Sequence, residues 1–151
     1  MYNKYINVRK GDCMYKESIS RGLRKGISTT WELTKVIVPV YFFVTFLKYT
    51  PILNWISDFF TPVMKIFGLP GEASLPLVLG NMLNLYAGIG AIAGLNLKAK
   101  QITIIAFMLS FSHSLFMETA VVKKTGMNVF IVLACRFSLA IISGIVLNLV
   151  L

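Results

Sequence analysis

The chain has 151 residues, of which 56% are hydrophobic and only 14% are charged, and its mean hydropathy is +0.74. Ordinary soluble domains carry about 25% charged residues, so this composition excludes that class. We therefore expect an all-α integral membrane protein with about four to five hydrophobic helices in contact with the lipid bilayer.

The net charge of +9 is concentrated at the start of the chain, where seven of the 15 basic residues lie within the first 25 positions. A basic segment just before a hydrophobic run is typical of a cytoplasmic N-terminus that contacts anionic lipid head groups. We therefore interpret residues 1–27 as a basic cytoplasmic segment, and we expect no nucleic-acid partner. Residues 28–151 are predicted to form a single membrane domain.

The first membrane helix is predicted from about residue 30 to residue 49. Thr29 and Glu32 match a capping box, the pattern in which a threonine and a glutamate three positions later satisfy free amides at a helix start. Pro39 lies within the apolar centre of this segment. We expect it to kink the helix without ending it, because neighbouring helices can satisfy the freed carbonyl.

A second helical element begins at Pro51 and runs to about residue 67, where the sequence GLPGE follows. Glycine and proline are the strongest turn signals, and hydrophobic segments flank them on both sides. This arrangement is compatible with a re-entrant helical hairpin with its tip near residues 68–74, which would place Glu72 at membrane depth. The alternative is an ordinary surface loop, with Glu72 near the start of the next helix.

The segment after this turn combines glycines with two asparagines. Asn81 and Asn84 are one helical turn apart and so share a face, where their amides could bind backbone groups, an ion or a solute. Gly90 and Gly94 match the small-residue motif of helix–helix contacts. The alternative is that the asparagines only hold helices together.

A helix is predicted from about residue 101 to residue 122, and a last one from about 128 to 151. Ionisable side chains within such segments are costly, so each must face protein or water. Arg136 is expected either to form an ion pair with Glu118 or Glu72, or to extend to a nearby interface. The lone histidine, His113, has no Cys/His partner at metal-ligand spacing, so we expect no metal site.

No catalytic motif is present, and we expect neither enzymatic activity nor a cofactor. Cys13 and Cys135 are two isolated thiols without the spacing of a disulfide framework.

Two stretches resemble a known family: GLPGEASLPLVLGNMLNLYAGIGAIAGL at 68–95 and KQITIIAFMLSFSHSLFMETAVVKKTG at 100–126. They are similar to the nucleoside-recognition, or Gate, domain family, in the single-domain bacterial branch of spore maturation proteins A and B. Related Gate segments occur in ferrous-iron transporter B and in concentrative nucleoside transporters. The resemblance covers about residues 23–147.

The resemblance implies a re-entrant hairpin around 68–74 and unwound or polar helix segments around 81–90 and 112–119. In full transporters of this kind, such segments bind the substrate. The candidate substrate-binding residues are Glu72, Asn81, Asn84, His113 and Glu118, and the candidate structural ion pair is Glu118 with Arg136.

The resemblance also implies a role. The chain is expected to act as one repeat of a transporter in the bacterial cell membrane, paired with a second copy of itself or with a paralogous Gate-domain subunit around an unknown small solute or ion. The alternative is a non-transporting membrane scaffold, for instance in spore maturation or in the cell envelope.

Overall fold

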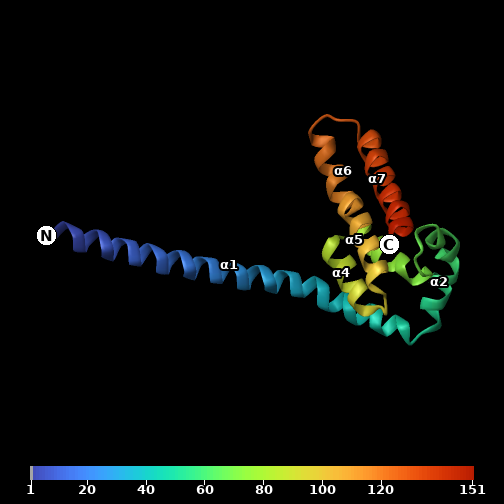
Figure 1. Ribbon diagram of the computed structural model, residues 1–151, viewed down its shortest axis with the longest axis horizontal. Coiled ribbons are helices and arrows are strands. Elements are labelled where there is room, and N and C mark those ends of the chain that lie inside the picture. The colour runs from blue at the N-terminus through green and yellow to red at the C-terminus, as the bar shows by residue number, and fades with distance from the viewer. Residues whose placement is uncertain (1) are drawn as a thin grey trace. The chain divides into compact units, whose positions relative to one another are not determined.

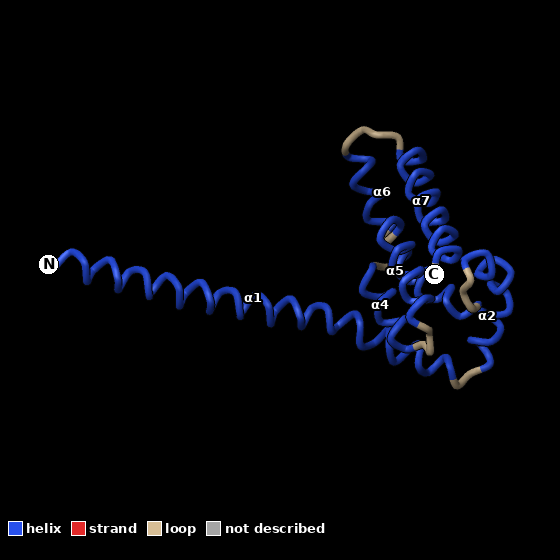
Figure 2. Tube along the Cα trace, in the orientation of Figure 1, coloured by secondary structure: helices blue, strands red, loops and turns tan. Residues whose placement is uncertain are grey.

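The computed structural model describes the backbone of residues 2–151 and the side chains of residues 15–151, and all regular structure in this range is helical (Figures 1 and 2). The chain divides into two compact units at Lys35 and Val36, which are described separately. The elements are α1 (Tyr2–Lys48), α2 (Pro51–Met64), η1 (Lys65–Phe67), η2 (Gly71–Ala73), α3 (Ser74–Met82), α4 (Leu85–Gly94), α5 (Ala99–Ser112), α6 (Leu115–Lys124) and α7 (Val129–Val150).

Helix α1 begins well before the predicted start near residue 30. The capping-box interpretation of Thr29 and Glu32 is therefore wrong, because no helix starts there; Glu32 instead accepts a hydrogen bond from Lys35 Nζ at 2.9 Å. Residues 2–28 contain no proline, and the intrinsic cost of the glycines in this stretch, about 1 kcal/mol each, does not stop the helix. Pro39 lies within α1 without ending it, as predicted.

Three segments are long and apolar enough to cross a membrane: Tyr15–Lys48, Ala99–Lys124 and Val129–Val150. A further pair, Pro51–Phe67 and Gly71–Met82, meets the same test jointly but is bent by 88°. The fold is therefore that of an all-α membrane protein with a sharply bent helical pair, which confirms the predicted class.

The bend of this pair depends on two glycines. Gly68 has a φ of +66°, a left-handed conformation that glycine adopts without a steric cost, and the Leu69 N–H donates to the Met64 carbonyl at 3.0 Å. At Gly71, an added Cβ would lie 2.0 Å from the carbonyl oxygen of Ser57. Only glycine therefore lets the tip of the hairpin lie directly against α2.

The core of the Val36–Leu151 unit is formed by apolar side chains and by close helix–helix contacts at small residues. Gly90 and Gly94 of α4 face α1 so closely that an added Cβ would lie 2.9 Å from the Ile37 carbonyl and 3.0 Å from Val44. The predicted glycine motif thus packs within the chain. Helix α5 contributes the most buried large side chains, Ile104, Ile105 and Leu109.

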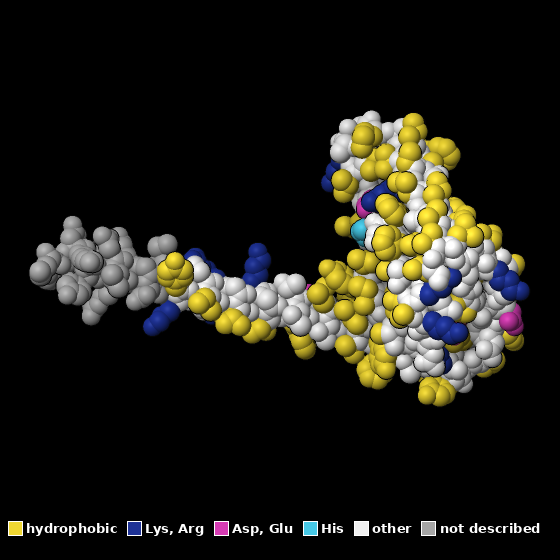
Figure 3. Space-filling view, in the orientation of Figure 1, with side chains coloured by type: hydrophobic (Ala, Val, Ile, Leu, Met, Phe, Trp, Pro, Cys, Tyr) yellow, Lys and Arg dark blue, Asp and Glu magenta, His cyan; other side chains and the backbone are white. Residues whose placement is uncertain are grey.

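The outer surface of this unit is apolar, as Figure 3 shows over α6 and α7. Phe130 and Leu149 are each 80% exposed, and Phe59 is 75% exposed. Large exposed apolar side chains in such numbers are the pattern of a surface that contacts lipid.

Candidate functional site

Two apolar segments of the Val36–Leu151 unit are broken in the middle. The helix predicted from about 101 to 122 is instead two helices, α5 and α6, with His113 and Ser114 between them. The segment after the hairpin is likewise divided into α3 and α4 at Leu83 and Asn84. The prediction of one continuous 101–122 helix is wrong, while the unwound segments implied by the family resemblance contain both breaks.

The first break is stabilised by its own asparagine. Asn84 has an extended backbone with φ −167°, and its Oδ1 accepts a hydrogen bond from the Ala87 N–H at 2.9 Å. This is the N-cap geometry, in which a side-chain oxygen satisfies one of the amides left free at a helix start. Asn84 therefore begins α4 and fixes the position of the break.

The second break contains an unusual backbone conformation. His113 is extended with ψ 154°, and Ser114 has a φ of +55°, the only positive φ at a non-glycine position in residues 2–151. A left-handed conformation costs a residue with a Cβ roughly 1–2 kcal/mol, so surrounding contacts must maintain it.

One backbone hydrogen bond joins the two breaks: the Ser114 N–H donates to the Gly80 carbonyl at 3.0 Å. Gly80 is in the last turn of α3, where carbonyls lack partners within the helix. The N–H of Ser114 at the second break thus pairs with the carbonyl that the first break leaves free. Gly80 also allows Leu109 of α5 to approach, since an added Cβ would lie 2.6 Å from its side chain.

Asn81 lies beside this junction with half of its amide unused. Its Nδ2 donates to the Leu77 carbonyl at 2.7 Å, whereas its Oδ1 is buried and has no hydrogen-bond partner among the described residues. Buried polar atoms are nearly always paired, so an unpaired one marks a place that water or a ligand can satisfy.

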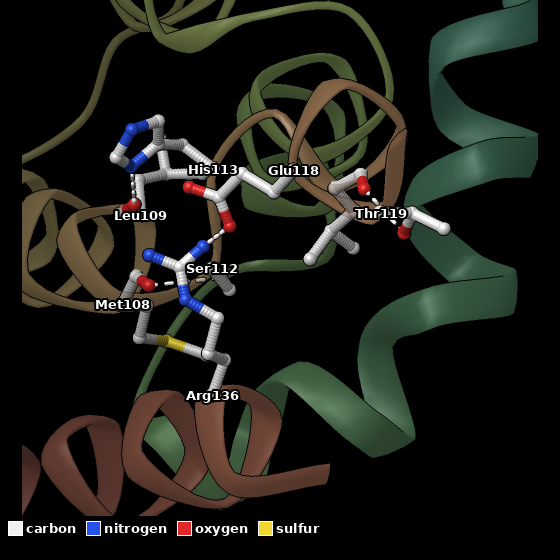
Figure 4. Close-up of polar contacts among 8 residues, drawn as sticks. Met108, Leu109, Ser112, His113, Glu118, Thr119 and Arg136 are labelled. Atoms are coloured by element: carbon white, nitrogen blue, oxygen red, sulfur yellow. Dashed lines mark hydrogen bonds and ion pairs between the residues drawn. The ribbon is translucent and has the colours of Figure 1, made fainter. Parts of the chain in front are cut away.

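The imidazole of His113 is turned back onto its own helix (Figure 4), where Nδ1 lies 2.9 Å from the Leu109 carbonyl. A carbonyl only accepts, so Nδ1 carries a proton and Nε2 is an acceptor in the neutral ring. The Ser112 hydroxyl likewise donates a hydrogen bond to a carbonyl of its own helix, that of Met108, at 2.9 Å.

Glu118, one turn into α6, forms an ion pair with Arg136 of α7 (Figure 4). The two side chains are 26% and 28% exposed and adjoin a groove of about 280 Å³ that is otherwise lined by valines. Sequence reasoning left Glu118 and Glu72 open as partners of Arg136, and the structure pairs it with Glu118.

Glu72 lies apart from these contacts. It is half-buried in η2 at the hairpin tip, and no hydrogen bond or ion pair involves its carboxylate within the described part of the chain. The structure therefore connects the two breaks, Asn81 and Asn84 through short contacts, whereas no hydrogen bond or ion pair joins the Glu72 carboxylate to them within the described residues.

This arrangement is suited to a polar solute or ion. At a break, the half-helix before it ends in free carbonyls and the half-helix after it begins with free amides, and transporters bind charged and polar groups with these ends. Two such breaks meet here, with an unpaired amide oxygen beside them. Within residues 15–151, no group of three His, Cys, Asp or Glu side chains is arranged to hold a metal ion.

Sequence reasoning missed two members of this junction, Ser114 and Gly80. The sequence SFSHSLF continues an apolar helical pattern without glycine or proline, so it carries no local signal of a break. Gly80 is one of several glycines near the asparagines in the sequence, and its role depends on a contact with Ser114, 34 positions away in the chain.

Comparison with known proteins places these features in context. The family model for Gate, described as nucleoside recognition, matches residues 30–146. The chain is 51% identical over 135 residues to the uncharacterized membrane protein YvoD of Bacillus subtilis (strain 168), covering 89% of this chain and 43% of that protein. It is 33% identical over 75 residues to the inner membrane protein YjiG of Escherichia coli (strain K12), covering 49% of this chain and 48% of that protein.

The matched part of this chain thus spans less than half the length of each of these relatives. No solved structure matches the chain.

Proposed function

The chain belongs to the Gate family of membrane proteins, and from this premise we propose that it forms part of a solute- or ion-binding site within a larger membrane assembly. The second part would come from another copy of the chain or from a paralogous Gate-domain subunit. This role is binding and translocation, without chemical change of the solute. The assembly would lie in a bacterial cell membrane with the N-terminus of this chain in the cytoplasm.

The observation that carries this proposal is the junction of the two helix breaks. The Ser114–Gly80 hydrogen bond places the ends of four short helices together, and the Oδ1 of Asn81 remains unpaired beside them. A packed bundle that only filled space would gain nothing from a left-handed serine and an unpaired amide, each of which costs free energy.

Two observations support a second subunit, and neither of them involves the glycine motif. Gly90 and Gly94 do not require an external partner, because they already contact α1. Support comes instead from Glu72, whose half-buried carboxylate has no partner in the described chain, and from YvoD, which is more than twice as long as the segment that it shares with this chain. A charged group at membrane depth must meet protein or water, and a facing subunit can supply either.

A specific observation favours the alternative, a scaffold without transport. Several polar side chains of the junction bond to their own helices: Nδ2 of Asn81 to Leu77, Ser112 to Met108, and Thr119 to Leu115 at 2.7 Å. Polar groups satisfied in this way can simply hold helices together. The two functions differ in whether the junction binds a solute.

A direct measurement of solute binding distinguishes the transport function from the scaffold function. We would titrate the purified protein in nanodiscs with tritiated uridine and adenosine, and separately with Na⁺, and follow binding by scintillation proximity and by thermal unfolding. Asn81→Ala should weaken any binding at least tenfold, a loss of roughly 1.4 kcal/mol or more for one buried hydrogen bond to a polar ligand.

Asn96→Ala is the matched control, because Asn96 is an exposed asparagine in the connection between α4 and α5. It should bind as the unmodified protein does. If no probe binds, or if both variants bind equally well, the site assignment fails and the scaffold function is the better conclusion.

A further inference from the structure

The unit that ends at Lys35 carries an apolar stripe without a partner. Its large side chains recur every four residues and are 61–73% exposed; they are Tyr15, Ile19, Leu23, Ile27 and Trp31. Each step of four residues turns about 40° around a helix, so the stripe covers about 160° of the circumference. A face this wide and this apolar requires a covering surface.

The other side of the same helix is basic. Arg21, Arg24 and Lys25 lie outside the apolar stripe, whereas Lys16 lies within its arc, and Figure 3 shows basic side chains projecting from both edges of the helix, including the edge opposite the hydrophobic row. Glu17 is the one acidic residue between Tyr15 and Trp31. The helix is therefore amphipathic and carries net positive charge.

Length places this stripe outside the bilayer core. The segment Tyr15–Lys48 has 34 residues, which corresponds to about 51 Å of helix, whereas a hydrocarbon core of about 30 Å needs only about 20 residues. Counting back about 17 residues from Lys48, the short end of the range that spans a hydrocarbon core, the crossing part begins near residue 32, next to Trp31, a residue type that prefers the interface. Tyr15, Ile19 and Leu23 then lie beyond the hydrocarbon.

We propose that residues 15–31 form an interfacial helix that lies on an anionic bilayer surface, with the apolar stripe inserted among the acyl chains and the basic side chains on lipid phosphates and carboxylates. Apolar residues on one face, Lys and Arg on the other, and aromatic rings at both ends are the features of helices that bind in this plane. The proposal goes beyond solute binding and does not depend on it.

Charge distinguishes this partner from a second copy of the helix. Two copies packed through the apolar stripe would leave their basic faces in water without a partner, whereas anionic lipid attracts each basic residue. The uniform four-residue spacing also drifts around the helix, unlike the alternating three- and four-residue spacing that keeps one seam in a coiled coil. Gly22 and Gly26, which leave an open groove beside Leu23 and Ile27, still allow a close helix contact as an outcome to test.

The test uses the full chain in nanodiscs, with Cys13 and Cys135 replaced by serine. An environment-sensitive fluorophore is attached to Ile19→Cys or Ile27→Cys on the stripe. Ser18→Cys and Ser28→Cys are the matched controls; they are chain neighbours of the first two, are also exposed, and lie off the stripe. Brominated lipids then quench whichever probes enter the acyl region.

In discs containing phosphatidylglycerol, we expect quenching at positions 19 and 27 to exceed that at 18 and 28 by roughly twofold or more. The variant Arg24→Gln/Lys25→Gln should lower the ratio of inserted to free helix by roughly fivefold per removed charge, and discs of phosphatidylcholine alone should lower it as well. These substitutions lie outside the membrane domain, so folding of the Val36–Leu151 unit is not at risk.

Two results would overturn the proposal. Equal quenching at all four positions would mean that the stripe stays in water. Protection of positions 19 and 27 that is independent of lipid charge, together with disulfide cross-linking of Gly26→Cys between two chains, would show that a second copy covers it.

Discussion

The chain interrupts its membrane helices in two different ways, at the hairpin tip and at the paired breaks. The hairpin turns through residues with special backbone properties: Gly68 in a left-handed conformation, Pro70, and Gly71 against the backbone of α2. The breaks contain no glycine or proline: Asn84 caps its own helix through the Ala87 N–H, and the Ser114 N–H donates to the Gly80 carbonyl of α3. Glycine and proline thus define the hairpin, a side-chain cap defines the first break, and a tertiary hydrogen bond maintains the second.

The largest effect should come from filling the hairpin contact. Gly71→Ala would place a Cβ 2.0 Å from the Ser57 carbonyl oxygen, and because that atom is backbone, α2 itself must move. Overpacking of this kind costs about 3 kcal/mol or more, so thermal unfolding in detergent should occur at a clearly lower temperature.

Gly22→Ala is the control for this substitution, since a Cβ there meets nothing within 4 Å. Its unfolding should change by less than about 1 kcal/mol, in the stabilising direction that alanine favours in a helix. If the two variants unfold alike, the hairpin tip does not pack against α2 as described.

The ion pair next to the second break should give the next largest effect. Glu118→Gln and Arg136→Gln should each lower the free energy of unfolding by about 2 kcal/mol, below the 3–5 kcal/mol of fully buried pairs because both side chains are about a quarter exposed. The double variant should lose clearly less than the sum of the two. Strict additivity in the same unfolding measurement would show that the charges act independently.

The first break should respond more weakly. Asn84→Ala removes the cap of α4 and should cost about 1 kcal/mol, whereas Asn84→Ser keeps a capping oxygen and should recover most of that loss. Hydrogen exchange of the Ala87 amide provides a local readout, and it should accelerate only in the alanine variant. Unchanged exchange there would mean that Asn84 does not begin the helix.

The smallest effect is expected at Ser114. Glycine adopts its φ of +55° without steric cost, but it also raises the entropy of the unfolded chain. Ser114→Gly should therefore unfold within about 1 kcal/mol of the unmodified protein, on the stabilising side. If Ser114→Gly instead lowers the free energy of unfolding by more than this amount, the serine hydroxyl makes a contact that the structure does not show.

This contrast explains which parts of the fold sequence reasoning could reach. The helix starting at Pro51, the hairpin around Gly68 and the last helix were predictable because proline, glycine and long apolar runs act through local backbone preferences. A close helix contact at Gly90 and Gly94 was predictable from the motif, but the sequence did not indicate that the partner helix is α1. The break at Ser114 was not predictable from its own residues, because it depends on a carbonyl of α3.

The candidate site divides in the same way. Asn81, Asn84 and Glu118 could be proposed because polar side chains in apolar helices are costly and therefore noticeable. Their geometry could not be predicted, because the two asparagine side chains make different hydrogen bonds. Asn84 caps its own helix, whereas the Oδ1 of Asn81 is unpaired. Whether Glu72 belongs with them stays a prediction.

Thiol labelling at the hairpin tests that prediction. With Cys13 and Cys135 replaced by serine, a cysteine at Glu72 should react with a small water-soluble methanethiosulfonate reagent and resist a bulky one, since non-helical backbone at membrane depth must adjoin protein or a wet cavity. Equal reaction with both reagents would make the turn a surface loop and would remove Glu72 from the site.

The most direct test is water access to the paired breaks in a bilayer. Asn84→Cys and His113→Cys are compared with Phe46→Cys, an exposed residue on the apolar surface of α1. If the breaks line a polar binding site, residues 84 and 113 react with the small reagent at least tenfold faster than residue 46 does, and a bulky reagent reacts slowly. Reaction at 84 and 113 no faster than at residue 46 would contradict a solute site, because the junction would then be dry.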